Sequence, residues 1–368
     1  MRQAEDSSDT TRREDDRPSL LARGRVGLAV GGIGFVLLTV AIFWYQFHAI
    51  RRSDAALGWD RLRFGYLLLG LLCLPVETLA AALRTSVVCR ILRPGVSLWT
   101  CVKAECANVA LNMVTPCHSG GGPAQIYMMS RTGVPVGTAL TISLMSFVGT
   151  LAGLLNIGLY TLLFAGPGRG QALSVMSLVV LAAIAAAMTL AAWRPEVLRT
   201  VLGSGRLMAL VHAYRDNVAR FFRRGKASLV WIYLLSVVFL LARGVLAYLC
   251  VRFLGVDAGS FREIVEIQMT MAFLVLFAPT PGGAGLAEGI SLSLMAHIVP
   301  IGLAPYYNLL WRSSTAYLTA LAGLACLSRA LLEDGRRVVS ARRRVESPAP
   351  YPSPAPLGGE LLTERKAS

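Results

Sequence analysis

The sequence predicts an all-α integral membrane protein with about six transmembrane helices and two re-entrant helical hairpins arranged as an inverted repeat. Hydrophobic residues make up 55% of the 368 residues and charged residues only 15%, a balance typical of polytopic membrane proteins. Apolar runs near the length of a bilayer span recur along the chain. Two of the apolar stretches break on the same signal, Thr-Pro followed by a glycine cluster.

The apolar runs define the expected elements in order. Runs long enough to cross a bilayer lie at about 26–47, 64–83, 136–164, 172–192, 228–251 and 303–328. The run at 26–47 has no convincing cleavage site, so we expect a retained helix rather than a signal peptide. Two shorter stretches, 99–114 and 263–279, run directly into the breaks. We therefore expect each to form one arm of a re-entrant hairpin.

The domain organisation follows from these runs. A polar N-terminal tail, 1–25, is expected to be disordered and cytoplasmic. The membrane domain covers 26–330, and the tail at 331–368, basic and then Pro-rich, is expected to be disordered. No room is left for a separate soluble catalytic domain of ordinary size.

The linker at 194–226 is basic and contains an amphipathic helix. Its apolar face is formed by Leu207, Leu210, Val211, Tyr214, Val218, Phe221 and Phe222. Such a helix can lie on the inner leaflet of the membrane. It can equally pack against the cytoplasmic side of the helix bundle, and the sequence leaves both readings open.

Arginines predict the orientation of the chain. They cluster in the N-terminal tail, in the 194–226 linker and after the last span, so both termini are expected in the cytoplasm of a bacterial inner membrane. Arg51, Arg52, Arg61 and Arg63 would then face outward, against the rule. The net charge of +15 is explained by this topology and by contact with anionic lipid rather than by nucleic-acid binding.

The two breaks predict an inverted repeat. The first occupies 115–123 and the second 280–285, and their Thr-Pro pairs start 165 positions apart. With the orientation above, the first hairpin enters the membrane from the cytoplasm and the second from outside. The repeat halves are expected at about 64–164 and 228–330, an arrangement typical of secondary transporters.

A ligand site is predicted where the two breaks face each other. Helices beginning at Pro123 and Ala284 would direct their positive ends, and free glycine N–H groups, toward a bound anion. The alternative is that the glycines only allow the hairpin arms to pack closely. The candidate substrate-binding residues are Asn112, Thr115, Pro116, Gly120, Gly121, Gly122, Gln125, Thr280, Pro281, Gly282, Gly283, Glu288 and Arg312.

Ionisable residues inside apolar segments are costly and are therefore further candidates. They are Arg84, Glu105, Arg243, Glu288 and Arg312. Arg312 and Glu288 are expected to form a charge gate, or else a purely structural ion pair. Cys101, Cys106, Cys117 and His118 do not have the spacing of a zinc site. We therefore expect no metal, no cofactor and no catalytic residue.

The residues around the breaks resemble a known family. The sequences 112–116 and 120–127, with 279–288 as a second motif, resemble the transmembrane domain of bacterial lysylphosphatidylglycerol synthetases over residues 26–330. Arg312 lies where that family carries an arginine in its last helix. The resemblance implies a lipid flippase. The soluble aminoacyl-transfer domain is missing from the sequence, so we expect no synthesis of lysyl lipid, and the charged residues that many members carry after the first motif are absent from 142–149.

These observations predict a flippase-like membrane transporter that moves an anionic or lipid-linked phosphate headgroup between leaflets. Its expected partners are an anionic phospholipid or a polyprenyl-phosphate-linked lipid and the membrane, with no nucleic acid. The sequence leaves homo-oligomerisation open. Two other classes also stay open: a membrane-embedded enzyme acting on lipid-linked intermediates, and a channel built on re-entrant helices.

Overall fold

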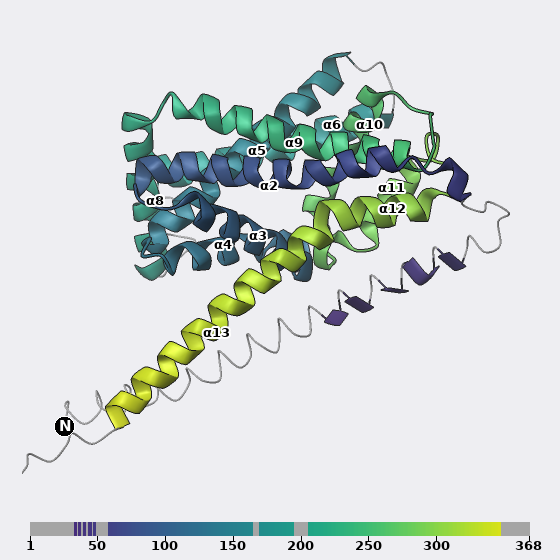
Figure 1. The fold of residues 1–368 in the computed structure, drawn as a ribbon. Coiled ribbons are helices and arrows are strands. Elements are labelled where there is room, and N and C mark those ends of the chain that lie inside the picture. Colours follow the sequence, from purple (N-terminus) through teal and green to yellow (C-terminus); the bar gives the residue numbers. More distant parts are fainter. Residues whose placement is uncertain are drawn as a thin grey trace, which may run out of the picture. The chain divides into compact units, whose positions relative to one another are not determined.

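The computed structural model describes residues 58–164, 169–194 and 205–346, together with part of 33–48. The predicted span at 26–47, the tail at 1–25 and the end of the chain from 347 lie largely or wholly outside the described residues. All regular structure in the described part of the chain is helical, as the sequence predicts (Figure 1).

Four helical stretches are long and apolar enough to cross a membrane among the described residues. They are α2 (Phe64–Leu92), the Val136–Asn156 part of α5 (Val136–Phe164), α9 (Ser228–Phe253) and Ala304–Arg337. The last stretch joins α12 (Ala304–Arg312), a π-helical turn η4 (Ser313–Tyr317) and α13 (Leu318–Glu346). The chain is therefore a multi-pass membrane protein. The sixfold count stays a prediction, because α6 (Arg169–Trp193) contributes only a shorter apolar stretch, Leu178–Leu190, to the described residues.

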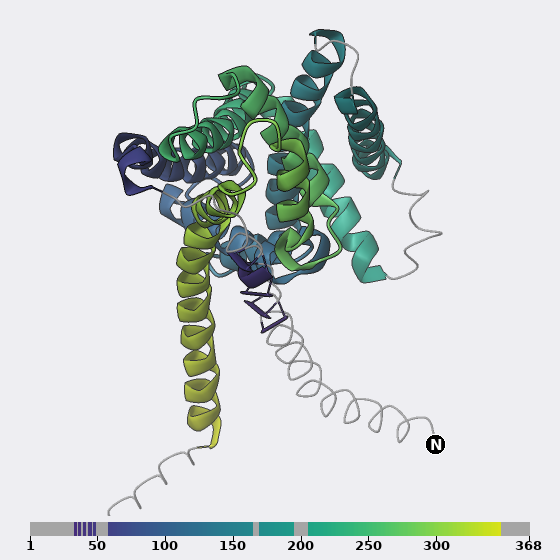
Figure 2. The ribbon, with the colours of Figure 1, turned by 90° about the vertical axis from the view of Figure 1, so that its right-hand side faces the viewer.

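Each predicted hairpin consists of a longer helix, a one-turn 3₁₀ segment and a short helix (Figure 2, blue for the first and green for the second). The first comprises α3 (Leu98–Val114), η2 (Pro116–His118) and α4 (Gly121–Ser130). The second comprises α10 (Phe261–Leu276), η3 (Pro281–Gly283) and α11 (Leu286–Leu294). The short helices begin at Gly121 and Leu286, so the predicted starts at Pro123 and Ala284 are wrong by two residues, in opposite directions.

Both hairpins begin with the same capping chemistry. The side chain of Ser97 accepts a hydrogen bond from Thr100 N at the start of α3. The side chain of Ser260 accepts a hydrogen bond from Glu263 N at the start of α10, and the side chain of Glu263 accepts one from Ser260 N. A serine that satisfies an orphan helix amide fixes where each arm starts. The hairpin arms are thus defined locally by the sequence.

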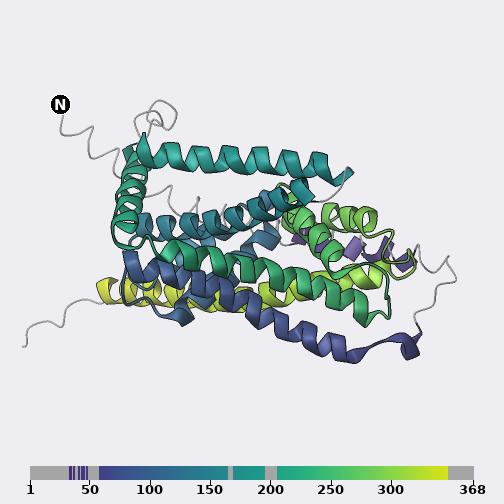
Figure 3. The same ribbon diagram turned by 90° about the horizontal axis from the view of Figure 1, so that it is seen from above.

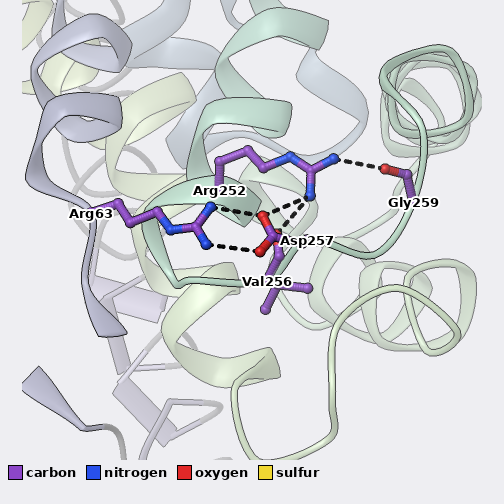
Figure 4. A network of polar contacts seen from close by, with 5 residues as sticks. All are labelled: Arg63, Arg252, Val256, Asp257 and Gly259. Atoms are coloured by element: carbon purple, nitrogen blue, oxygen red, sulfur yellow. Dashed lines mark hydrogen bonds and ion pairs between the residues drawn. The ribbon is translucent and has the colours of Figure 1, made fainter. Parts of the chain in front are cut away.

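Helices α2 and α9 pack along their length, side by side in Figure 3, with the start of α2 beside the end of α9. The backbone amide of Arg63 donates to Phe253 O at 3.0 Å. The Arg63 guanidinium binds both carboxylate oxygens of Asp257 at 2.7 and 2.8 Å (Figure 4). Arg252 lies 3.6 Å from the same carboxylate and donates to the carbonyl of Gly259. The hydrogen bonds from Arg63 lower the pKa of Asp257, and one arginine that contradicts the predicted orientation therefore has a carboxylate partner.

The face of α2 turned away from the other helices is strongly apolar. Leu68 and Leu72 are 66% and 63% exposed, with Leu69, Val76 and Leu79 also exposed along the same helix. An apolar surface of this kind on a helix of 29 residues matches lipid contact rather than water contact.

The amphipathic helix α8 (Gly205–Arg224) packs against the bundle. Tyr214, Val218 and Phe221 are buried, and the helix contacts α5, α2 and α6. A Cβ atom at Gly137 of α5 would lie 2.7 Å from Ala213 Cβ, so the two helices approach closely. Of the two readings, the structure favours packing on the bundle, although Leu207 and Phe222 at the ends of the helix stay exposed.

The chain after 330 differs from expectation. Helix α13 continues to Glu346, so the prediction of disorder from 331 is wrong for 331–346. Residues 331–346 contain leucine, arginine and glutamate, which favour helices, and they contain no proline. The next proline in the chain is Pro348. The described residues from Ser328 to Glu346 belong to a separate compact unit.

Candidate functional site

The two breaks meet in the structure. The amide of Cys117 in the first donates to the carbonyl of Ala278, which precedes the second, at 2.9 Å. Each break is a threonine in extended conformation followed by one 3₁₀ turn that begins at the proline, and the second turn residue has left-handed backbone angles in both. The sequence correctly predicted that these segments, 165 positions apart, lie together.

Two side chains at the C-terminal end of α3 fix the backbone of the first break by hydrogen bonds. Thr115 Oγ1 accepts a hydrogen bond from the Gly120 amide at 2.9 Å and donates to Leu111 O at 2.7 Å. Asn112 Oδ1 accepts from the Gly121 amide at 2.9 Å. A Cβ atom at Gly121 would overlap Asn112 Oδ1, so only glycine allows this approach.

A buried ion pair holds the second break. Arg312, at the end of α12, donates from Nη2 to Gly282 O at 2.8 Å, and its Nε lies 2.9 Å from Glu288 Oε1. The other oxygen of Glu288 accepts from the Gly285 amide at 2.7 Å. Both side chains are at least 95% buried. The Nε–H does not meet the angle for a hydrogen bond, so this contact is a close charge pair whose directional bond goes to Gly282 O.

The prediction that the glycine amides of the two breaks are free is therefore wrong for most of these amides. The amides of Gly120, Gly121, Gly283 and Gly285 donate to Thr115 Oγ1, Asn112 Oδ1, Thr280 O and Glu288 Oε2. An amide inside a membrane protein must be satisfied internally when no ligand is bound, and the loops do this with their own neighbours. These four amides are therefore not free to bind an anion in this conformation.

A cavity of about 460 Å³ lies between the two halves. Of the predicted site residues, Asn112, Gly122, Gln125 and Arg312 line it. Glu288 reaches it only through Arg312, and Thr115, Pro116, Gly120, Gly121, Thr280, Pro281, Gly282 and Gly283 belong to the loops rather than to the lining. Further polar lining residues come from both halves: Glu77, Thr78, Arg84, Glu105, Asn108, His118, Ser119, Ser143, Ser146, Thr150, Arg243, Gln268, Thr315 and Thr319.

Two of the three arginines that line the cavity have carboxylate partners. Arg312 is paired with Glu288, and Arg243 of α9 donates from Nε to Glu77 of α2 at 3.0 Å. Both contacts thus have the form of a structural ion pair, which the sequence left open as the alternative to a charge gate. A gating role for Arg312 and Glu288 stays a prediction.

Neutral side chains surround the remaining buried carboxylate of the cavity. Glu105 Oε1 accepts from Thr85 Oγ1 and from Gln125 Nε2, the latter at 2.8 Å. Gln125 in turn accepts from Ser143 at 2.6 Å. Sequence reasoning named Glu105 and Gln125 but missed Glu77, Thr85 and Ser143. Each of these is a polar residue inside an apolar helix. Such a residue indicates a functional site only when the fold shows that several of them lie close together.

The cysteines of the first hairpin differ in burial. Cys101 and Cys106 are buried on α3, whereas Cys117 is exposed. Among the described residues, no three His, Cys, Asp or Glu side chains gather closely enough to hold an ion.

Comparison with known proteins gives one result. A family model described as the lysylphosphatidylglycerol synthase TM region matches residues 26–323, which is most of the chain. No curated protein matches the sequence.

Proposed function

This chain belongs to the lysylphosphatidylglycerol synthase TM-region family, and from that membership we propose that it is a flippase-like transporter rather than an enzyme. It resides in the bacterial cytoplasmic membrane with both termini inside. It moves a phosphate-bearing headgroup, from an anionic phospholipid or a polyprenyl-phosphate-linked lipid, between leaflets. The observation that carries the proposal is the cavity of about 460 Å³ that both halves of the chain line with buried charged and polar side chains as well as apolar ones.

The lining of the cavity supports transport over simple lipid contact. Buried charges and amides in an apolar helix bundle are costly unless they serve a polar ligand or each other. Here they face one space, with α2, α3, α4 and α5 contributing from one half and α9, α10 and α12 from the other. A cavity shared by two halves changes its access when the halves rock against each other.

The contact between the breaks supplies the hinge in this proposal. The hydrogen bond from Cys117 to Ala278 joins the two halves, whereas the pair of Arg312 with Glu288 lies within the second half and fixes its break. In an inverted repeat, the bond between the halves would break and form as access alternates. The element order of the halves is the same, hairpin between two long helices, which is the arrangement such a mechanism uses.

Reconstitution tests the proposal directly. The full chain is placed in vesicles containing fluorescent phosphatidylglycerol, and translocation is measured by chemical quenching of the outer leaflet. Ala272→Trp fills the cavity and should reduce the rate at least tenfold, whereas Leu72→Trp on the lipid-facing surface of α2 should leave it unchanged. Folded wild-type protein that translocates neither this lipid nor a polyprenyl phosphate would sink the proposal, and lipid converted to a new product would indicate an enzyme.

A further inference from the structure

We propose that Arg84 of α2 binds the phosphate of the headgroup inside the cavity. The inference rests on the proposed function and assigns its ligand-binding cation, which the pattern around the breaks does not mark. It differs from the sequence-based expectation, in which glycine amides bind the anion and Arg312 forms a charge gate with Glu288.

The three cavity arginines differ in their partners. Arg243 has Glu77 and Arg312 has Glu288, each within ion-pair distance. Arg84 is 95% buried, yet no carboxylate of the described residues lies within 4 Å of it. Among the described residues, Arg84 is therefore the cavity arginine without a carboxylate at ion-pair distance, and Glu105 acts on it only through longer-range electrostatics.

Only neutral groups contact the Arg84 guanidinium. Its Nη1 donates to Thr150 Oγ1 at 2.6 Å and to Ser236 Oγ at 3.2 Å, and the group lies 5.5 Å from the ring centre of Phe239. Its Nε is buried without a hydrogen-bond partner. Two hydroxyls and an aromatic ring orient a guanidinium but do not neutralise it, and a buried cation whose counter-charge lies beyond contact distance is costly.

The helices leave room for this arginine. Gly149 of α5 lies opposite it, and a Cβ atom there would stand 2.8 Å from Ser236 Oγ and 3.3 Å from Arg84 Cδ. Three helices, α2, α5 and α9, thus converge on one side chain through a glycine and two hydroxyls. A guanidinium held in this way still has free donors of its rigid fork, and this geometry suits a phosphate oxygen pair.

Glu105 sets a limit on the ligand. Its carboxylate lines the same cavity and is held by Thr85 and Gln125 rather than by Arg84. A second negative group on the ligand would be repelled there, whereas one phosphate can be neutralised by Arg84. The shared chemistry is therefore a single phosphate group, as in phosphatidylglycerol or phosphatidylethanolamine, or as free phosphate.

Binding to the purified full chain tests the assignment. The probes are dihexanoyl phosphatidylglycerol, dihexanoyl phosphatidylethanolamine and dihexanoylglycerol, which lacks phosphate, with inorganic phosphate as a competitor. Wild-type protein should bind both phospholipids at least tenfold more tightly than dihexanoylglycerol, since charge-assisted bonds are lost in the latter. Arg84→Gln should remove that preference, Arg84→Lys should keep part of it, and Arg63→Gln, outside the cavity, should keep all of it.

The wild-type comparison keeps the test decisive even if Arg84→Gln fails to fold. Equal binding of dihexanoylglycerol and the phospholipids by wild type overturns the inference, as does a folded Arg84→Gln that retains the preference. Competition by inorganic phosphate supports a free-phosphate ligand, and its absence supports the lipid headgroup; both support Arg84 as the phosphate site. Translocation by wild type without any effect of Arg84→Gln overturns only this inference, whereas phosphate binding without translocation overturns only the proposed transport.

Discussion

The two breaks share a backbone but differ in the residues that form it. Cys117 has φ 50° and ψ 27°, and its counterpart Gly282 has φ 58° and ψ 14°. His118 and Gly283 follow with φ 52° and 69°. The second break uses glycine where left-handed angles are needed, whereas the first places a thiol and an imidazole there. A left-handed non-glycine residue costs about 1–2 kcal/mol, so the first break stores strain that the second avoids.

The difference also extends to how each break is held. Neutral side chains, Thr115 and Asn112, satisfy the first, whereas the Arg312–Glu288 pair satisfies the second. The strained His118 lines the cavity, and its Nδ1 is buried without a partner. The first break therefore presents side chains to the cavity, and the second serves mainly as a charged clasp.

The largest expected effect comes from opening the charged clasp. Arg312→Gln or Glu288→Gln leaves a buried charge unpaired and should destabilise the protein by about 3–5 kcal/mol. The double variant should recover part of this loss, because no isolated charge remains. Thermal unfolding in detergent, followed by circular dichroism, measures all three. Single variants that melt like wild type would show that the clasp is not stabilising.

The threonines separate the two breaks by matched substitution. Thr115→Val removes an acceptor for the Gly120 amide and should cost about 1–2 kcal/mol. Thr280 Oγ1 is buried without a partner, so Thr280→Val should be neutral or slightly stabilising. Denaturation of the two variants side by side gives the comparison. Equal losses at both positions contradict the asymmetry.

Exchanging residues at the left-handed positions should shift stability in opposite directions. Gly282→Ala forces a Cβ atom into left-handed backbone and should cost about 1–2 kcal/mol. Cys117→Gly relieves the same strain and should stabilise by about 0.5–1 kcal/mol after the entropy of glycine is subtracted. Unfolding midpoints distinguish the signs, and Cys117→Ser, which keeps the strain, is the control.

The smallest expected effect lies outside the breaks, where the start of α2 contacts the end of α9. It serves as a baseline for the substitutions in the breaks. Arg63 lowers the pKa of Asp257 in the folded protein, so the contact stabilises the fold above the unfolded pKa of about 4 and loses this contribution as pH falls through the lower folded value. Asp257→Asn should therefore reduce the melting temperature slightly at pH 7 and not at about pH 2. A deficit that persists at the lower pH contradicts this account.

Much of the site could be predicted because its signals are local. Thr-Pro-glycine breaks, serine caps at Ser97 and Ser260, and a glutamate one turn after the second break are all visible in the sequence. The lining residues were harder to predict. Glu77 and Ser143 are polar residues in apolar helices, and nothing local distinguishes a residue that faces the cavity from one that faces a neighbour.

The sequence alone determined the all-helical membrane class, four of the spans that the structure describes, both hairpins and the family. These depend on apolar run length, prolines and glycines, which act over a few residues. The tertiary structure alone decided which amides are occupied, which arginines have carboxylate partners and that Arg84 has none at ion-pair distance among the described residues. Such pairings join residues up to 194 positions apart, as Arg63 and Asp257 do, so they depend on how the helices pack.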